Sequence, residues 1–130
     1  MAHGQLALTE QGAAVRLANA GHPPPLALGQ GLAAPVQARG TLLGVNPHVA
    51  LTEVAFELRG GDMLVLYTDG VTEARGVDGF SGAQRLMTTV GSVEQPCAEA
   101  VTAALLTDVE TFQHGRLRDD IAILVIEATP

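Results

Sequence analysis

Residues 61–74 read GDMLVLYTDGVTEA, and the apolar run Met63–Tyr67 within this stretch decides the fold. A strand that is apolar at every position is covered on both faces, so the run predicts a central strand of a buried sheet. The turn residues of 59–62 precede it, and Asp69-Gly70 follows it closely. The core is therefore expected to lie on both sides of Met63–Tyr67.

Further strands and helices are predicted on either side of this run. Alternation predicts a hairpin from residues 5–9 and 15–18, a short strand at 26–28, a strand at 49–58 whose pattern slips once at a bulge, and a buried strand at 121–126. Helical spacing occurs at 81–90 and again over 97–109. Ser92 is expected to cap the second helix, and Cys97 to lie in its apolar stripe.

Composition limits the class of protein. The 130 residues fit one domain, and 47% hydrophobic with 16% charged residues predicts a folded, soluble chain. The net charge is −7, and the seven basic residues, all arginine, are scattered, which argues against a nucleic-acid partner. No apolar run is long enough to span a membrane, and the single cysteine is compatible with a reducing cytoplasm. We expect a cytoplasmic protein without a nucleic-acid or membrane partner.

Aspartates stand at the ends of two predicted buried strands. Asp69 follows the first strand, and Asp119-Asp120 precedes the strand at 121–126. If these strands pair antiparallel, both carboxylates share one rim of the sheet, where a divalent cation between them would offset their repulsion. Oxygen ligands without Cys or His favour Mg²⁺ or Mn²⁺ over Zn²⁺. Turn chemistry explains each aspartate separately, so the spacing alone leaves both interpretations open.

Four stretches together resemble the successive motifs of the SpoIIE-type phosphatase family. They are NAGHPPPL at 19–26, TLLGV at 41–45, the stretch at 61–74 and DDIAILV at 119–125, in the family's order. YTDGVTEA at 67–74 is the most specific of them. The resemblance covers essentially the whole chain. It implies an α+β fold, the α-β-β-α sandwich of PPM-type protein-serine phosphatases, with mostly antiparallel strands and two or three helices.

The resemblance also implies roles for particular residues. In this family two ions, Mn²⁺ or Mg²⁺, activate a water that attacks a phosphoserine, so no side chain acts as the nucleophile. Metal-site residues are implied at Asp69, Gly70 and Asp119. Three further residues are expected beside the ions: Asp120 as a hydrogen-bonding neighbour, Glu73 bonded to backbone or to an arginine, and His22 ordering its proline-rich loop.

One family motif has no counterpart in this sequence. An earlier Gly-Asp motif, whose aspartate bridges both metals, is missing, so residues 1–130 are expected to form one partial domain, the C-terminal half, with an incomplete site. An apolar sheet face left exposed would favour a homodimer. The expected substrate is a phosphorylated anti-anti-sigma (STAS-like) protein in bacterial sigma-factor regulation. The alternative is a noncatalytic interaction module that keeps the phosphatase fold.

Overall fold

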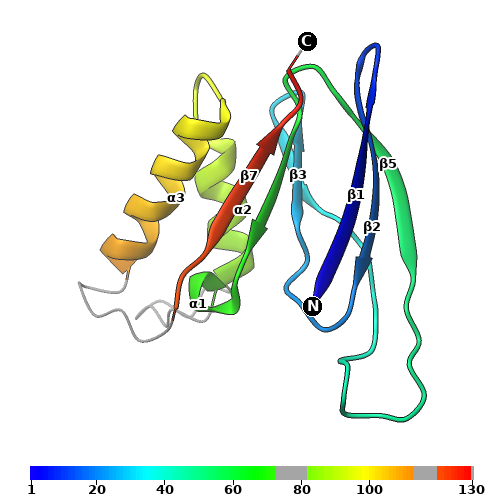
Figure 1. Ribbon diagram of the computed structural model, residues 1–130. Helices are drawn as coiled ribbons and strands as arrows, with labels where there is room; N and C mark the ends of the chain where they lie inside the picture. Colours follow the sequence, from blue (N-terminus) through cyan, green and yellow to red (C-terminus); the bar gives the residue numbers. More distant parts are fainter. Residues whose placement is uncertain (73–81, 113–119, 130) are drawn as a thin grey trace.

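The computed structural model describes residues 1–72, 82–112 and 120–129. Within them, two antiparallel sheets pack face to face and helices cover the outer face of one sheet (Figure 1). The first sheet has the order β1-β2-β5, and the second has the order β4-β3-β6-β7. This arrangement confirms the predicted class of mostly antiparallel strands with a few helices.

The three-stranded sheet begins with the predicted hairpin. β1 (Ala2–Thr9) pairs with β2 (Gly12–Asn19), which pairs in turn with β5 (Glu53–Arg59). The strand predicted at 49–58 starts only at Glu53, and the β2–β5 register runs without a bulge. The apparent slip in its pattern arises because residues 49–52 belong to a loop, whose arms are joined by Thr41 N–H···O=C Ala50 (2.9 Å) and Thr52 N–H···O=C Arg39 (2.9 Å).

The four-stranded sheet is centred on the run that the sequence singled out. β6 (Met63–Tyr67) lies between β3 (Leu26–Gly29) and β7 (Ile123–Glu127), while β4 (Leu32–Pro35) pairs with the other edge of β3. Met63 and Val65 are fully buried towards the helices, and Leu64 is buried towards the other sheet. Each aliphatic side chain buried in this way contributes about 1.5–3 kcal/mol. The prediction of a central strand covered on both faces is confirmed.

The helices cover only one face of this sheet in the described part of the chain. α1 (Asp69–Thr72) follows β6 directly, and α2 (Gly82–Gly91) and α3 (Ala98–Phe112) pack on the β3-β6-β7 face through Leu86, Val90 and a stripe of α3. The stripe consists of Val101, Leu105 and Val109. None of the helices in the described ranges is long and apolar enough to cross a bilayer.

Two expectations about the start of α3 were wrong. Ser92 belongs to the end of α2, where its Oγ donates to the Thr89 carbonyl (2.7 Å). Cys97 is exposed rather than buried, because it precedes the helix and its Sγ accepts from the Ala100 N–H (3.4 Å). A carboxylate from the sheet completes this cap, since Glu127 Oε2 accepts from the Ala98 N–H (2.8 Å).

Both sheets leave apolar side chains uncovered on their inner faces. Leu8 of β1 pairs with the buried Ala13 and so points to the same inner side, yet it is 93% exposed. In β7, Leu124 pairs with Leu66, which packs in the core between the sheets, and it is 57% exposed. β1 and β7 are edge strands, so in the described residues the space between the sheets is not closed beyond them.

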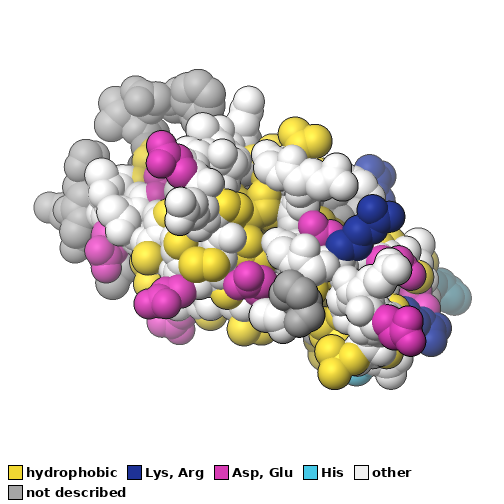
Figure 2. All heavy atoms as spheres, turned by 90° about the horizontal axis from the view of Figure 1, so that it is seen from above, with side chains coloured by type: hydrophobic (Ala, Val, Ile, Leu, Met, Phe, Trp, Pro, Cys, Tyr) yellow, Lys and Arg dark blue, Asp and Glu magenta, His cyan; other side chains and the backbone are white. Residues whose placement is uncertain are grey.

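Acidic and apolar side chains mix on the end of the molecule where the β1–β2 and β5–β6 turns lie. Figure 2 shows this end, with Asp and Glu spread among hydrophobic side chains and, on one side, next to arginine side chains. The motif-bearing loops lie at the opposite end, at the foot of Figure 1, where β6 ends and where β3 and β7 begin.

Candidate functional site

The ends of β6 and β7 meet at one rim of the four-stranded sheet. The last paired residues are Tyr67 and Ile123. Beyond them, Thr68 N–H donates to the Ala122 carbonyl (3.0 Å), and Thr68 Oγ1 accepts from Ala122 N–H (3.0 Å) and donates to the Asp120 carbonyl (3.2 Å). The antiparallel pairing on which the metal-site interpretation depends is therefore present, and it brings Asp120 beside the segment that leads into Asp69.

Asp69 is the first residue of α1 and is exposed at this rim. The turn that carries it is closed by two local hydrogen bonds, from Val71 N–H to the Thr68 carbonyl (3.0 Å) and from Thr72 Oγ1 to the Asp69 carbonyl (3.1 Å). Gly70 is buried beneath the turn. The Asp69 carboxylate is thus presented to solvent on a short backbone turn packed against the sheet.

The other predicted site residues have different positions. Asp119 and Glu73 lie outside the described residues. Asp120 is exposed, and its contact with the Asp69 segment is made by its backbone carbonyl. His22 lies in the loop between β2 and β3, where the Asn19 side chain binds its backbone.

The loop that contains His22 is fixed at the same end of the sandwich. The Tyr67 hydroxyl, at the end of β6, donates to the Pro24 carbonyl (2.8 Å). Burial raises the pKa of Tyr67 above its usual 10.0, so the hydroxyl stays protonated as a donor. Gly21 has φ 74°, and a Cβ there would lie 2.5 Å from Leu42 Cδ1, so this loop packs closely against the motif at 41–45. Together with the bonds from Thr68 to Asp120 and Ala122, these tertiary contacts join all four sequence motifs around the end of β6.

The oxygen atoms at this rim are of the type that a hard divalent cation binds. Asp69 offers a carboxylate, and carboxylate and carbonyl oxygens are the ligands that Mn²⁺ and Mg²⁺ prefer. No group of three or more His, Cys, Asp or Glu side chains suited to a metal occurs among the described residues. Among the described residues, the Asp69 carboxylate is therefore chemically suited to such an ion, as one member of a larger set of ligands.

Residues 4–129 match the family Stage II sporulation protein E (SpoIIE). The chain belongs to the SpoIIE family. Two curated relatives are similar to this chain. The phosphoserine phosphatase RsbU of Bacillus subtilis is 28% identical over 111 residues, which are 84% of this chain and 33% of RsbU. Protein IcfG of Synechocystis is 39% identical over 74 residues, 55% of this chain and 12% of IcfG. The chain thus spans a third or less of these relatives.

The fold is that of the SpoIIE phosphatase domain. The Mn-presoaked structure of this domain from Bacillus subtilis superimposes with a TM-score of 0.78 at 16% identity and covers 98% of this chain. The present chain corresponds to 56% of that structure. The expected PPM-type architecture is confirmed, and the chain accounts for about half of the domain to which it is similar.

Sequence reasoning did not assign roles to three side chains at this end of the SpoIIE-family fold. Asn19 is the only buried polar residue among the described ones, and its side chain closes the Asn19–His22 turn. Tyr67 anchors the proline-rich loop, and Arg85 of α2 contacts α1. The only indication in the sequence that Asn19 has a structural role was its position as a polar residue at the end of a predicted strand. Arg85 gave none, because its partners lie 14 and 23 residues away in sequence.

Proposed function

We propose that this chain is the C-terminal half of a metal-dependent protein-serine phosphatase domain of the SpoIIE family. The observation that carries the proposal is the join between β6 and β7. There the Thr68 backbone and hydroxyl hold the Asp69 segment against residues 120–122. In a SpoIIE-family chain this geometry supports a metal site at the rim, because it brings the two acidic strand ends together.

The chain's own residues would bind and orient the ions. Asp69 would ligate a cation through its exposed carboxylate, Gly70 would let the backbone turn closely beside it, and Asp119 would supply a second carboxylate from the neighbouring segment. When bound, Mn²⁺ or Mg²⁺ lowers the pKa of its water and neutralises charge on the phosphoryl oxygens. Thr68 fixes the spacing of the two segments, because its hydroxyl accepts from the Ala122 N–H and donates to the Asp120 carbonyl, while its own N–H donates to the Ala122 carbonyl.

The substrate class in this proposal is a phosphoserine protein. The relative RsbU is a phosphoserine phosphatase, and the solved SpoIIE phosphatase domain was presoaked with Mn. We take the substrate to be a phosphorylated anti-anti-sigma (STAS-like) regulator in the cytoplasm. The competing function is a noncatalytic module that keeps the fold and binds such a partner.

The test measures Mn²⁺ binding and hydrolysis of a phosphoserine peptide by the 130-residue chain. Asp69→Asn should abolish both, while the control Glu57→Gln, which removes an exposed carboxylate from β5 of the other sheet, should change neither. Mn²⁺ binding that survives in Asp69→Asn would refute the site. Turnover by the unmodified chain would exclude the noncatalytic module, whereas binding without turnover would fit either an incomplete half-site or that module.

The proposal extends to assembly. Leu6 and Leu8 of β1 lie on the inner side of their sheet but are 45% and 93% exposed, and Leu124 of β7 is similarly uncovered. Apolar side chains on the edge strands of two sheets favour association, because burial removes them from water. A second copy of the chain, packed on this inner edge, would cover them.

A further inference from the structure

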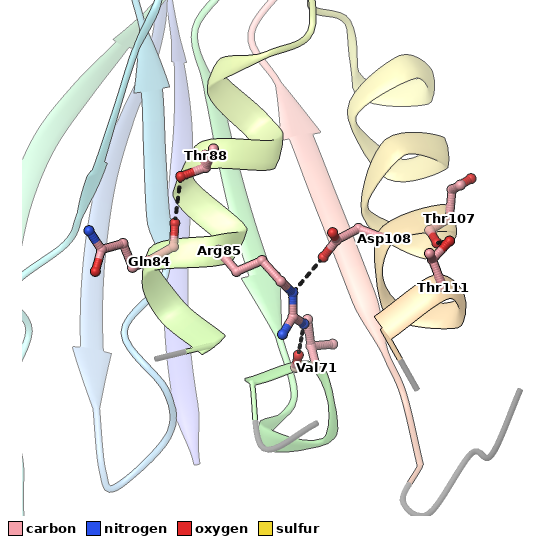
Figure 3. Close-up of polar contacts among 7 residues, drawn as sticks. All are labelled: Val71, Gln84, Arg85, Thr88, Thr107, Asp108 and Thr111. Carbon is pink, nitrogen blue, oxygen red and sulfur yellow. Dashed lines mark hydrogen bonds and ion pairs between the residues drawn. The ribbon is translucent and has the colours of Figure 1, made fainter. Parts of the chain in front are cut away.

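Arg85 of α2 joins three helices in one cluster (Figure 3). Its Nε donates to Asp108 Oδ2 of α3 (2.8 Å), and one terminal nitrogen donates to the Val71 carbonyl of α1 (3.0 Å). Its guanidinium carbon also lies 3.6 Å from the centroid of the Phe112 ring. One planar side chain thus contacts the acid and the ring of α3 and the backbone of α1.

The cluster is largely removed from water. The side chains of Arg85 and Asp108 are 13% and 24% exposed, and Arg85 Nη1 is buried without a hydrogen-bond partner. Desolvation offsets much of the attraction in a buried ion pair, so such a pair is weak evidence for stability. The role of the guanidinium here is geometric, because its rigid N–H donors fix the position of the Val71 carbonyl relative to the Asp108 carboxylate.

The helix that Arg85 contacts, α1, is too short to be stable by itself. α1 has four residues, and a single helical turn is unstable without tertiary contacts. Val71 anchors it by a fully buried side chain. Gly82, one turn before Arg85 on α2, meets α1 so closely that a Cβ would lie 2.0 Å from the Thr72 carbonyl oxygen. Gly82 and Arg85 therefore form one α2 surface that packs against the backbone of α1.

We propose that Arg85 is a positioning residue for Asp69, acting through the Val71 carbonyl. The carbonyl that it binds lies two residues after Asp69 in the same turn, so the direction of the Asp69 carboxylate depends on the place where Arg85 holds that turn. This inference rests on the proposed function for the metal, but the fixing of the turn is a property of the chain without metal.

The test compares four variants by two readouts. Arg85→Met removes the donors at similar volume, Arg85→Lys keeps the charge, and Asp108→Ala breaks the ion pair but leaves the donor to Val71. Arg16→Met, which breaks the exposed Arg16–Glu53 pair on the other sheet, is the matched control. The readouts are amide hydrogen exchange of residues 69–72 without metal and the dissociation constant for Mn²⁺.

Arg85→Met should speed amide exchange in residues 69–72, while exchange in β6 stays unchanged. It should also weaken Mn²⁺ binding by about 10-fold or more, which is the usual effect of removing a group that orients a metal ligand. Arg85→Lys should recover part of both effects. Asp108→Ala should change them less than Arg85→Met, and Arg16→Met not at all.

Two outcomes would overturn the proposal: unchanged exchange of residues 69–72 in folded Arg85→Met, or equal effects of Arg85→Met and Asp108→Ala on Mn²⁺ binding. If Arg85→Met does not fold, an Arg85→Lys variant that matches the unmodified chain in both readouts overturns it as well. Faster exchange in a chain that binds no Mn²⁺ would support the role of Arg85 in fixing the turn and refute the proposed metal function instead.

Discussion

Asn19 offers the sharpest test of how the proline-rich loop is held. Its side chain is 3% exposed and makes two hydrogen bonds to one residue, from Nδ2 to the His22 carbonyl (2.7 Å) and from the His22 N–H to Oδ1 (2.8 Å). Asn19→Ala removes both. At about 0.5–1.5 kcal/mol for each bond, and with two backbone groups left unpaired in a half-buried loop, the expected loss in free energy of unfolding is about 2–3 kcal/mol.

The matched control is Asn46→Ala. Asn46 also binds backbone through Oδ1, which accepts from the His48 N–H (2.9 Å), but in an exposed loop. Its loss should cost less than about 0.5 kcal/mol, as for most surface substitutions. Asn19→Asp should lose at least as much as Asn19→Ala, because a carboxylate oxygen would then face the His22 carbonyl in place of a donor.

Urea unfolding followed by circular dichroism measures these differences. With the slope of about 1–3 kcal/mol/M that is usual for small domains, Asn19→Ala should lower the midpoint by about 0.7–3 M. The slope itself should not change, because both variants unfold the same core. Equal midpoints for Asn19→Ala and Asn46→Ala would refute the reasoning, since the buried and the exposed asparagine would then contribute alike.

Three further predictions concern a loop contact, a helix start and an edge strand. Tyr67→Phe loses the bond to the Pro24 carbonyl and should lower the free energy of unfolding by about 1 kcal/mol, measured by urea unfolding. Burial raises the pKa of Tyr67 in the folded chain, so its contribution to stability should be fully present below pH 10 and be lost as the pH rises through the folded pKa. Tyr67→Phe should lack this decline. Glu127→Gln removes the anion at the start of α3 and should lower the free energy of unfolding by about 0.3–1 kcal/mol, and a melting temperature equal to that of the unmodified chain would contradict this. Leu8→Glu should convert the proposed dimer to monomer in sedimentation equilibrium. Leu32→Glu should not, because Leu32, also apolar and 75% exposed, lies on β4, the edge of its sheet opposite β7. A monomer already in the unmodified chain would exclude the dimer.

Much of the scaffold follows from local pattern. The apolar run Met63–Tyr67 predicts a strand that is covered on both faces, and the structure places this strand between β3 and β7. The prolines at 23–25 exclude regular structure, and the loop there is irregular. The prediction failed at 49–52, at Ser92, at Cys97 and in part at 121–126, where β7 begins at Ile123 and Leu124 is 57% exposed. At 49–52 and at Cys97 the apolar spacing continued beyond the strand and the helix themselves. Backbone bonds between loop arms and a helix start decided those segments.

By itself the sequence determined the family, the central strand and the two acidic strand ends, because every motif on which they rest is a short run of consecutive residues. Only the tertiary structure decided which distant groups hold the site. Antiparallel pairing of β6 with β7 brings Thr68 to Asp120, Tyr67 reaches Pro24 across 43 residues, and Arg85 reaches both Val71 and Asp108. Such contacts have no local pattern, because hydrogen bonds of this kind depend on how whole elements pack and not on the spacing of residues along the chain.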